Sequence, residues 1–299
     1  MTQKKTWADM TFWEKLGNID YRWLYALSII FTIIPIVQPL GMAIQVSEPT
    51  KAYVNVIKNL PAGSVVAVSF GASAQLIDEQ EAQFLATWKC LFQQKVKVMF
   101  YSTQPDGPIL LKQELTGPKA IVKPASYGYT YGVDYVDLGY SPLGEAGEAS
   151  ICTNIRGIFK VDAYGTPLDN IPMMKDVNDQ SKIALIIFEY TSCTDVEFPI
   201  RQWVVPFHKP CIVMTLGCCG PMAAPYYPTQ IQGFLSGSGM GTEIEVYSGN
   251  PGPGALMSDA KNLGILPFLA FFVLGNISYL GKRFARAEQR GEAPTEVKK

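Results

Sequence analysis

The cysteines are the residues whose type and spacing point most directly to chemistry. Cys193 follows an apolar run at 183–190, and Cys218 and Cys219 follow a second apolar run at 211–216. Both runs are typical of buried strands, and neighbouring strands lie about 4.8 Å apart. If the two strands are neighbours, Cys193 comes within disulfide range of either Cys218 or Cys219. An exported domain in an oxidising compartment would permit that bond.

Two other interpretations of these cysteines stay open. Free buried thiols fit the sequence about as well as a disulfide does, because cysteine often packs as a small apolar residue. Three thiolates could also bind a metal ion, but the sequence supplies no fourth ligand to complete a structural zinc site. We therefore predict no metal site.

Small and hydroxylated residues recur where the apolar runs end. In open α/β sheets, ligands bind at the carboxyl ends of the strands, so these positions form a candidate ligand site. The candidate residues are Ser73, Thr103, Asp106, Tyr140, Ser192, Cys193 and Cys218. Ordinary strand-to-helix turns select the same residue types, and the sequence favours that interpretation over ligand binding.

No familiar catalytic motif accompanies these residues. The sequence lacks the Gly-x-Ser-x-Gly, His-Glu-x-x-His and phosphate-loop patterns. The sequence has one histidine, His208, and catalytic triads and many zinc sites need histidine, so few such sites are possible.

Acidic residues near strand ends are common. The sequence does not show which of Glu145, Glu148, Glu189 and Asp195 could form a pair for acid–base catalysis. A net charge of −1 provides no basic footprint for nucleic acid. We predict no catalytic residue, no cofactor and no nucleic-acid partner.

Apolar runs and helical periodicity place these residues in an alternating pattern of strands and helices. Continuous apolar runs predict strands at 64–70, 96–102, 135–138, 183–190 and 211–216. Helical spacing predicts helices at 78–94, 108–115, 144–159 and 196–205. The alternation predicts an α/β fold with a doubly wound, mostly parallel sheet of the flavodoxin or Rossmann kind.

Three further segments carry predictions about the domain. We expect Pro221 to open a helix with Tyr227, Ile231, Phe234 and Leu235 on one face. We assign 243–247 to an edge strand inside a glycine-rich tail. The segment 161–181 is irregular, and loops of that length in compact domains are often contact surfaces.

Two uncharged apolar stretches, 23–44 and 263–281, flank the domain. A helix of about 20 such residues spans a bilayer core of roughly 30 Å. The predicted division is a leader with a candidate interfacial helix (1–22), a transmembrane helix (23–44), an extracytoplasmic α/β domain (45–262), a second transmembrane helix (263–281) and a basic tail (282–299). Basic residues lie mainly outside the two stretches: Lys4, Lys5, Lys15, Arg22, Lys282, Arg283, Arg286 and Arg290. The positive-inside rule then predicts a two-pass protein in the cell membrane with both termini in the cytoplasm.

Several central stretches also carry a resemblance. They are LPAGSVVAVSF (60–70), YVDLGY (135–140), GTPLDNIPMMK (165–175), the apolar run 183–190 and GFLSGSGMGTEIE (233–245). Together they resemble a family of uncharacterised prokaryotic membrane-anchored α/β proteins, over most of 55–247. The resemblance implies an α/β domain with flanking membrane helices. It implies no activity and transfers no site residue.

Three functions are compatible with these features. The first is a non-catalytic subunit of a membrane complex, whose partners are the lipid bilayer and other membrane-protein subunits or a second copy. The second is a tethered sensor or receptor domain that binds a small molecule at the strand ends. The third is a hydrolytic or thiol-dependent enzyme that uses Cys193, Cys218 or Cys219, and it requires an accessible thiolate. The absence of a catalytic constellation favours the first.

Overall fold

The computed structural model describes residues 7, 10–38, 40–42, 44–250, 252 and 254–289, without the side chains of 256–257 and 286–289. The chain divides into two compact units. One is Ala43–Ala255, and the other combines Met1–Met42 with Leu256–Lys299.

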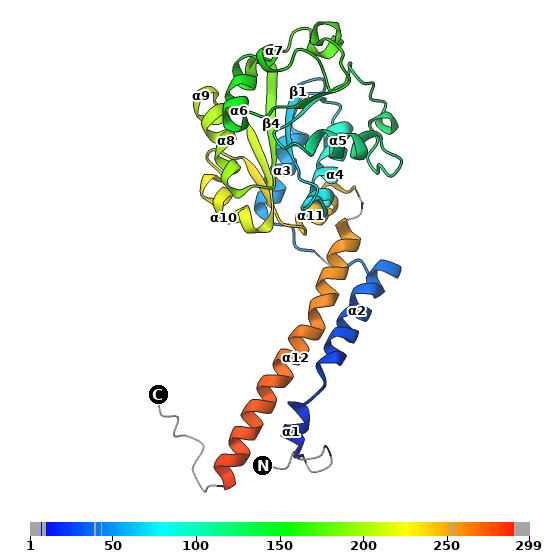
Figure 1. Ribbon diagram of the computed structural model, residues 1–299, viewed down its shortest axis with the longest axis vertical. Helices are drawn as coiled ribbons and strands as arrows, with labels where there is room; N and C mark the ends of the chain where they lie inside the picture. The colour runs from blue at the N-terminus through cyan, green and yellow to red at the C-terminus, as the bar shows by residue number, and fades with distance from the viewer. Residues whose placement is uncertain are drawn as a thin grey trace. The chain divides into compact units, whose positions relative to one another are not determined.

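A six-stranded parallel sheet forms the centre of the unit Ala43–Ala255 (Figure 1). The strands lie in the order β3-β2-β1-β4-β5-β6, and each neighbouring pair is parallel. This is the strand order of doubly wound dinucleotide-binding sheets. The predicted α/β class with a parallel sheet is confirmed. The strands are β1 (Val65–Gly71), β2 (Lys97–Ser102), β3 (Tyr135–Tyr140), β4 (Ile183–Tyr190), β5 (Cys211–Thr215) and β6 (Gly233–Ser236).

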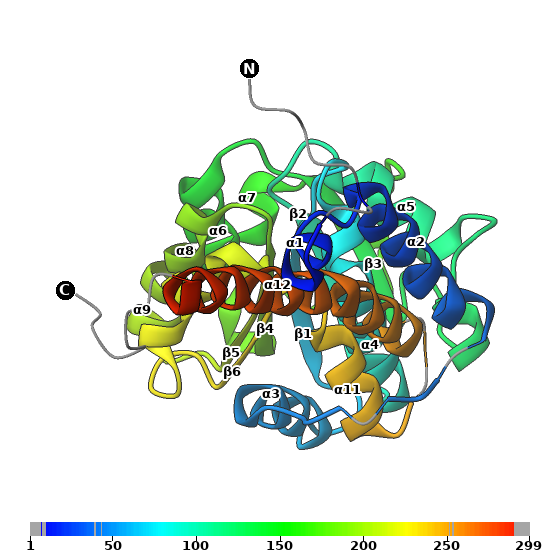
Figure 2. The same ribbon diagram turned by 90° about the horizontal axis from the view of Figure 1, so that it is seen from below.

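Helices cover both faces of this sheet (Figures 1 and 2). One face packs against α3 (Glu48–Lys58), α4 (Ile77–Gln93), α5 (Gly107–Thr116) and α11 (Met240–Ser248). The other packs against α6 (Gly144–Thr153), α7 (Ile155–Ile158), α8 (Glu197–Pro199), a π-helical turn at Ile200–Val204, α9 (Val205–Phe207) and α10 (Gly220–Ala223). In β4, Leu185 and Ile187 belong to the first core, whereas Ile186 and Phe188 belong to the second. Burial on both faces explains the continuous apolar runs.

Aromatic packing holds α4 against β1 and β2. The Trp88 ring centroid lies 4.8 Å from that of Phe84, 5.3 Å from that of Phe100 and 5.6 Å from that of Phe70. All four side chains are fully buried, and these separations are the ones that aromatic pairs prefer. The first turn of α4 is thereby positioned at the carboxyl end of β1.

The predicted helix after Pro221 is wrong. Only α10 is α-helical there; a 3-10 turn follows at Ala224–Tyr226, then a cis peptide bond between Tyr227 and Pro228, and then β6. Pro221, Pro225 and Pro228 are closely spaced, and each lacks the amide proton that a helix interior requires. Phe234 and Leu235 therefore lie on a strand that pairs with Val213 and Met214 of β5.

The predicted edge strand at 243–247 is also wrong, because these residues lie in α11. The alternation of charged and apolar residues at Glu243, Ile244 and Glu245 is typical of a strand with one face exposed to solvent. All three side chains are buried instead. Glu243 accepts hydrogen bonds from the backbone N–H and hydroxyl of Ser47 at 2.9 and 2.7 Å. Glu245 accepts from the backbone of Gly254 and Ala255 at 2.9 and 3.1 Å. Tertiary partners therefore make the glutamates interior residues, and both ends of the unit meet at α11.

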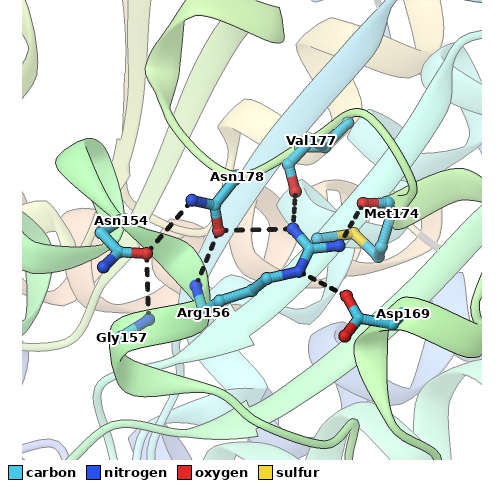
Figure 3. Close-up of polar contacts among 7 residues, drawn as sticks. All are labelled: Asn154, Arg156, Gly157, Asp169, Met174, Val177 and Asn178. Carbon is cyan, nitrogen blue, oxygen red and sulfur yellow. Dashed lines mark hydrogen bonds and ion pairs between the residues drawn. The ribbon is translucent and has the colours of Figure 1, made fainter.

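The irregular segment 161–181 is held by Arg156 (Figure 3). Its guanidinium donates to the carbonyl oxygens of Met174 and Val177 at 2.8 and 2.9 Å, and to Asp169 at 2.9 Å. Two 3-10 turns, Leu168–Asn170 and Pro172–Met174, lie within it, and a third begins near its end at Gln180–Lys182.

The predicted single helix at 144–159 is interrupted at Asn154, whose backbone is not helical and whose side chain caps α7.

The first apolar stretch forms α2 (Tyr21–Val37), and the prediction that a helix continues to residue 44 is wrong. Gln38 is extended, with φ −138° and ψ 101°, because a residue that precedes proline avoids the helical region. Beyond it, the backbone N–H groups of Leu40, Gly41 and Met42 donate to the carboxylate of Asp259 at 2.9, 2.9 and 3.2 Å. Asp259 is 1% exposed.

The second apolar stretch lies inside α12 (Gly254–Gln289). The part Ser258–Ala285 is long and apolar enough to cross a membrane, and it is the one such helix among the described residues; α2 is shorter. The prediction of two transmembrane helices is therefore supported for one helix by length and composition. The short α1 (Phe12–Leu16) places Trp13 against α12, where Ser278 donates to the Trp13 carbonyl at 2.7 Å.

Candidate functional site at the carboxyl edge of the sheet

The strand order reverses direction between β1 and β4, so the carboxyl ends of these two strands form the switch point where such sheets bind ligands. The strands approach closely there. A Cβ atom on Gly71 would lie 2.3 Å from the backbone oxygen of Glu189, a separation that only glycine permits. The Thr191 hydroxyl donates to the Gly71 carbonyl at 2.9 Å and ties the two strand ends together.

Three of the predicted ligand residues gather over β1 and β2. The carboxylate of Asp106 accepts the backbone N–H of Ala74 at 3.1 Å, which joins the segment containing Ser73 to the loop after β2. The Thr103 hydroxyl is buried and without a hydrogen-bond partner among the described residues. Asp106 thus organises the turns, as polar residues of ordinary strand-to-helix turns do.

Tyr140 and Ser192 are not drawn into that group. Tyr140 ends β3 at the sheet border and is 39% exposed. The Ser192 hydroxyl lies 2.8 Å from that of Thr194, within its own turn. The predicted ligand residues are therefore divided among the β1–β2 end, the end of β3 and the β4–β5 end. Within the described part of the chain, no hydrogen bond joins Ser73, Thr103 or Asp106 to Ser192.

The three cysteines meet over β4 and β5. These strands are neighbours, and a disulfide joins Cys193 to Cys219, one of the two pairings that the sequence left open. Cys218 is a free, exposed thiol. Its sulfur lies 3.8 Å from that of Cys193 and 3.8 Å from that of Cys219. The adjacent Gly217 N–H donates to Glu79 of α4 at 2.7 Å, which holds this turn against the helix.

Two glutamates lie buried beneath this edge, on opposite faces of the sheet. Glu148 of α6 accepts hydrogen bonds from Ser69 at 2.8 Å, Tyr101 at 2.6 Å and Trp203 at 3.2 Å. Burial raises the pKa of Glu148 to about 7, although the three donors oppose that shift. A carboxyl with such a pKa can hold or release a proton near neutrality.

Glu189 of β4 belongs to the opposite face and is fully buried. Neither of its carboxylate oxygens has a hydrogen-bond partner among the described residues. Burial raises its pKa well above the usual range for a glutamate and so favours the neutral carboxyl. A neutral carboxyl in an apolar layer is a cost to stability rather than a defined acid–base pair.

The sequence alone assigns no role to Glu148 or Glu189. A usable signal existed for Glu148, because it lies three and four residues before Ile151 and Cys152, on the apolar stripe of its helix. The apolar face of a helix packs toward the core, so an acidic residue on that face is expected to be buried. Nothing local reveals its partners, because Ser69, Tyr101 and Trp203 come from three other elements.

A third acidic group includes Asp137, which lies within β3. Burial raises the pKa of Asp137 to about 6, and its carboxylate accepts the Gly139 N–H at 2.9 Å. Asp162 nearby accepts from the backbone of Tyr164 and Thr166 at 2.9 and 2.7 Å. These bonds shape the turn after residue 160, so the group is structural.

Two pockets are lined by other residues of the chain. One, of about 710 Å³, is lined by residues 45–48, Lys51, Val246 and Tyr247, near the start of α3. The other, of about 340 Å³, lies between α2 and α12 and is lined by Thr32, residues 260–261, residues 264–265 and Phe268. Neither contains a predicted ligand residue.

No protein-family model, curated protein or solved structure matches this chain. The class is therefore defined by the fold alone: an α/β protein with a six-stranded parallel sheet and, among the residues that the structure describes, one helix apolar enough to cross a membrane. The resemblance to membrane-anchored α/β proteins gains no support from relatives, and no site residue is transferred from any.

Proposed function

We propose that the protein is a two-pass, membrane-anchored and non-catalytic subunit of a larger membrane assembly. In this proposal the α/β domain lies outside the cytoplasm and contacts other proteins through the carboxyl edge of its sheet. Membrane anchoring rests on the exposure of apolar side chains along α12. Only 11% of its apolar stretch within Ser258–Ala285 is buried. Lipid or another protein must cover such a surface, since monomers rarely leave large apolar patches in water.

The second span rests on α2 and its continuation. The seventeen residues of α2 span about 25 Å, slightly less than the hydrocarbon core of a bilayer, which is roughly 30 Å thick. A bilayer accommodates such a mismatch by local thinning. Five isoleucines of α2 are between 43% and 59% exposed: Ile29, Ile30, Ile33, Ile34 and Ile36. Non-helical backbone near lipid needs internal partners, and Asp259 supplies them to Leu40, Gly41 and Met42.

Two observations favour an extracytoplasmic domain. Lys15 and Arg22 precede most of α2, and Lys282 and Arg283 lie near the end of α12, as the positive-inside rule expects for cytoplasmic flanks. The Cys193–Cys219 disulfide belongs to the domain, and disulfides persist mainly in oxidising compartments outside the cytoplasm.

Exposed apolar residues at the carboxyl edge support a protein-contact role. Large apolar side chains follow the ends of four strands and remain between 38% and 66% exposed: Leu76, Ile109, Tyr140, Leu143 and Met222. Because all strands are parallel, these segments share one edge of the sheet. Exposed apolar residues along an edge suit a contact surface.

The test compares two substitutions in the full-length protein, extracted from its own membrane in mild detergent and weighed by native mass spectrometry. Leu143→Asp places a charge at the carboxyl edge, and aspartate suits this position because Leu143 is the N-cap residue of α6. Ile121→Asp is the matched control, since Ile121 is 56% exposed and lies between α5 and β3, on the way to the amino end of that strand.

We expect the unaltered protein to appear in a complex heavier than one 32.9 kDa chain. Leu143→Asp should release the partner chains, whereas Ile121→Asp should retain them. A wild-type protein that is only monomeric would refute the assembly role. Full retention of partners by Leu143→Asp would refute the assignment of the carboxyl edge as the contact surface.

A further inference from the structure

The three cysteines at the ends of β4 and β5 differ in accessibility. Cys218 is exposed, Cys193 is partly buried and Cys219 is fully buried. The free Cys218 sulfur lies 3.8 Å from each sulfur of the Cys193–Cys219 disulfide. The equal distances place it beside the disulfide rather than on the axis of the bond. A rotation of the exposed Cys218 side chain is therefore needed for attack along that axis.

The backbone around the cluster is fixed by its own hydrogen bonds. The Gly217 N–H donates to Glu79 at 2.7 Å, and the Cys219 N–H donates to the Leu216 carbonyl at 3.0 Å. The Asp195 N–H donates to the Ser192 carbonyl at 3.3 Å on the other side. The exchange therefore calls for movement of the three cysteine side chains between two turns that are held by these hydrogen bonds.

We propose that Cys193, Cys218 and Cys219 form a thiol–disulfide exchange site, in which the bond to Cys193 moves between the buried Cys219 and the exposed Cys218. The Cys218 thiolate attacks the Cys193 sulfur, a Cys193–Cys218 bond forms, and the Cys193–Cys219 bond breaks. The electron pair leaves on Cys219, which takes up the proton that Cys218 released. The step is an isomerisation that needs no oxidant or reductant, and it follows the usual course of thiol–disulfide exchange.

The two isomers differ in what solvent can reach. With Cys219 in the bond, one sulfur of the disulfide is fully buried; with Cys218 in the bond, that sulfur is at the surface. Attack on a disulfide depends on access to its sulfurs. The site's substrate class is therefore a low-molecular-weight thiol. Its thiolate attacks the exposed Cys218 sulfur of this isomer, forms a mixed disulfide on Cys218 and releases the Cys193 thiolate.

The other three cysteines cannot do the same. Cys90, Cys152 and Cys211 are buried and free. Burial raises the pKa of the Cys152 thiol to about 12 and raises those of Cys90 and Cys211 as well, so these thiols stay protonated. They serve as internal controls for the exchange site.

The experiment maps the disulfide in the full-length protein, purified in mild detergent without reductant. Samples are held between about pH 6 and about pH 8, because the thiolate is the attacking species. Free thiols are then trapped with N-ethylmaleimide in acidic denaturant, and peptic fragments are sequenced by mass spectrometry. Fragment ions show whether Cys218 or Cys219 carries the label.

We expect two labelled species in the wild type, with faster interconversion at higher pH. Cys218→Ala should keep the Cys193–Cys219 bond and carry no label on the cluster. Cys219→Ala should form the Cys193–Cys218 bond, and Cys90→Ala should leave both species unchanged. A wild type that is labelled only on Cys218 at every pH, or on all three cysteines, would overturn the proposal. Thermal unfolding of each variant shows whether it is folded.

A second arm tests the substrate class with cysteine as the small thiol. The disulfide of Cys218→Ala should be reduced more slowly than that of the wild type, because its one isomer keeps the buried sulfur. Equal rates would show that the isomerisation does not control access, which would contradict the proposed reaction with small thiols. The first arm follows an intramolecular exchange and does not depend on whether the protein forms an assembly.

Discussion

The Glu148→Gln substitution should remove a pH dependence of folding stability that the buried carboxyl creates. Burial raises the pKa of Glu148 from 4.5 to about 7. Between these pH values the folded protein holds a proton that the unfolded chain has lost. The free energy of unfolding is therefore highest below the unfolded pKa and falls as pH rises through the folded pKa.

The size of the effect follows from the pKa of about 7 and the reference value of 4.5. Linkage gives a loss of about 2.5 kcal/mol in the free energy of unfolding between about pH 5 and about pH 8. For a unit of this size, each kcal/mol shifts the unfolding temperature by about 2–4 °C. The carboxyl alone should therefore lower the unfolding temperature by roughly 5–10 °C across this pH range.

Glutamine fits the site without a lost hydrogen bond. Its carbonyl oxygen can replace Oε2, which accepts from Tyr101 at 2.6 Å and Trp203 at 3.2 Å. Its amide can donate to the Ser69 hydroxyl, which accepts as readily as it donates. The variant therefore changes the charge at this site and little else.

The assay is thermal unfolding of the full-length protein in mild detergent, followed by tryptophan fluorescence at several pH values. Glu189 and the other titrating groups are shared by both proteins, so the comparison isolates Glu148. We expect the variant to gain about 2.5 kcal/mol on the wild type as pH rises from about 5 to about 8. Unfolding temperatures that change in parallel over this range would refute the assignment of a raised pKa to Glu148.

Two other predictions concern the strand ends and the membrane. Gly71→Ala should lower the free energy of unfolding by about 1–3 kcal/mol, because its Cβ would lie 2.3 Å from the Glu189 carbonyl oxygen. Gly239→Ala, whose Cβ would meet open space, should change it by less than about 0.5 kcal/mol in the same urea titration; similar losses in both would contradict the close-approach argument. Epitope tags at the two termini should both be reached only from the cytoplasmic side in cells with a selectively opened membrane, and tags on opposite sides would show a single span.

The strands could be predicted where burial on both faces leaves a continuous apolar run. The run 183–190 became β4 with the same bounds, and 211–216 became β5 with one residue fewer. The failures lie where local pattern and tertiary environment disagree. Phe234 and Leu235 join a short edge strand after closely spaced prolines, and Glu243 and Glu245 are buried only because distant backbone donors reach them.

The candidate site shows the same division. The sequence placed Cys193, Cys218 and Cys219 after two apolar runs, and it restricted the disulfide to two pairings. The choice of Cys219 required the backbone directions of both turns, which leave Cys218 exposed beside the bond. Glu148 lies on the same apolar face of its helix as Ile151 and Cys152, which indicates burial. Its hydrogen-bond donors come from three other elements, so residues near it in sequence do not predict them.

By itself, the sequence determined the α/β class and an apolar helix long enough for a membrane, because both follow from hydrophobic periodicity along contiguous residues. The tertiary structure decided the strand order, the end of α2, the pairing of the cysteines and the burial of Glu148 and Glu189. Each of these depends on contacts between residues far apart in the chain. Local preference is too weak to specify such contacts, because packing and buried hydrogen bonds override it.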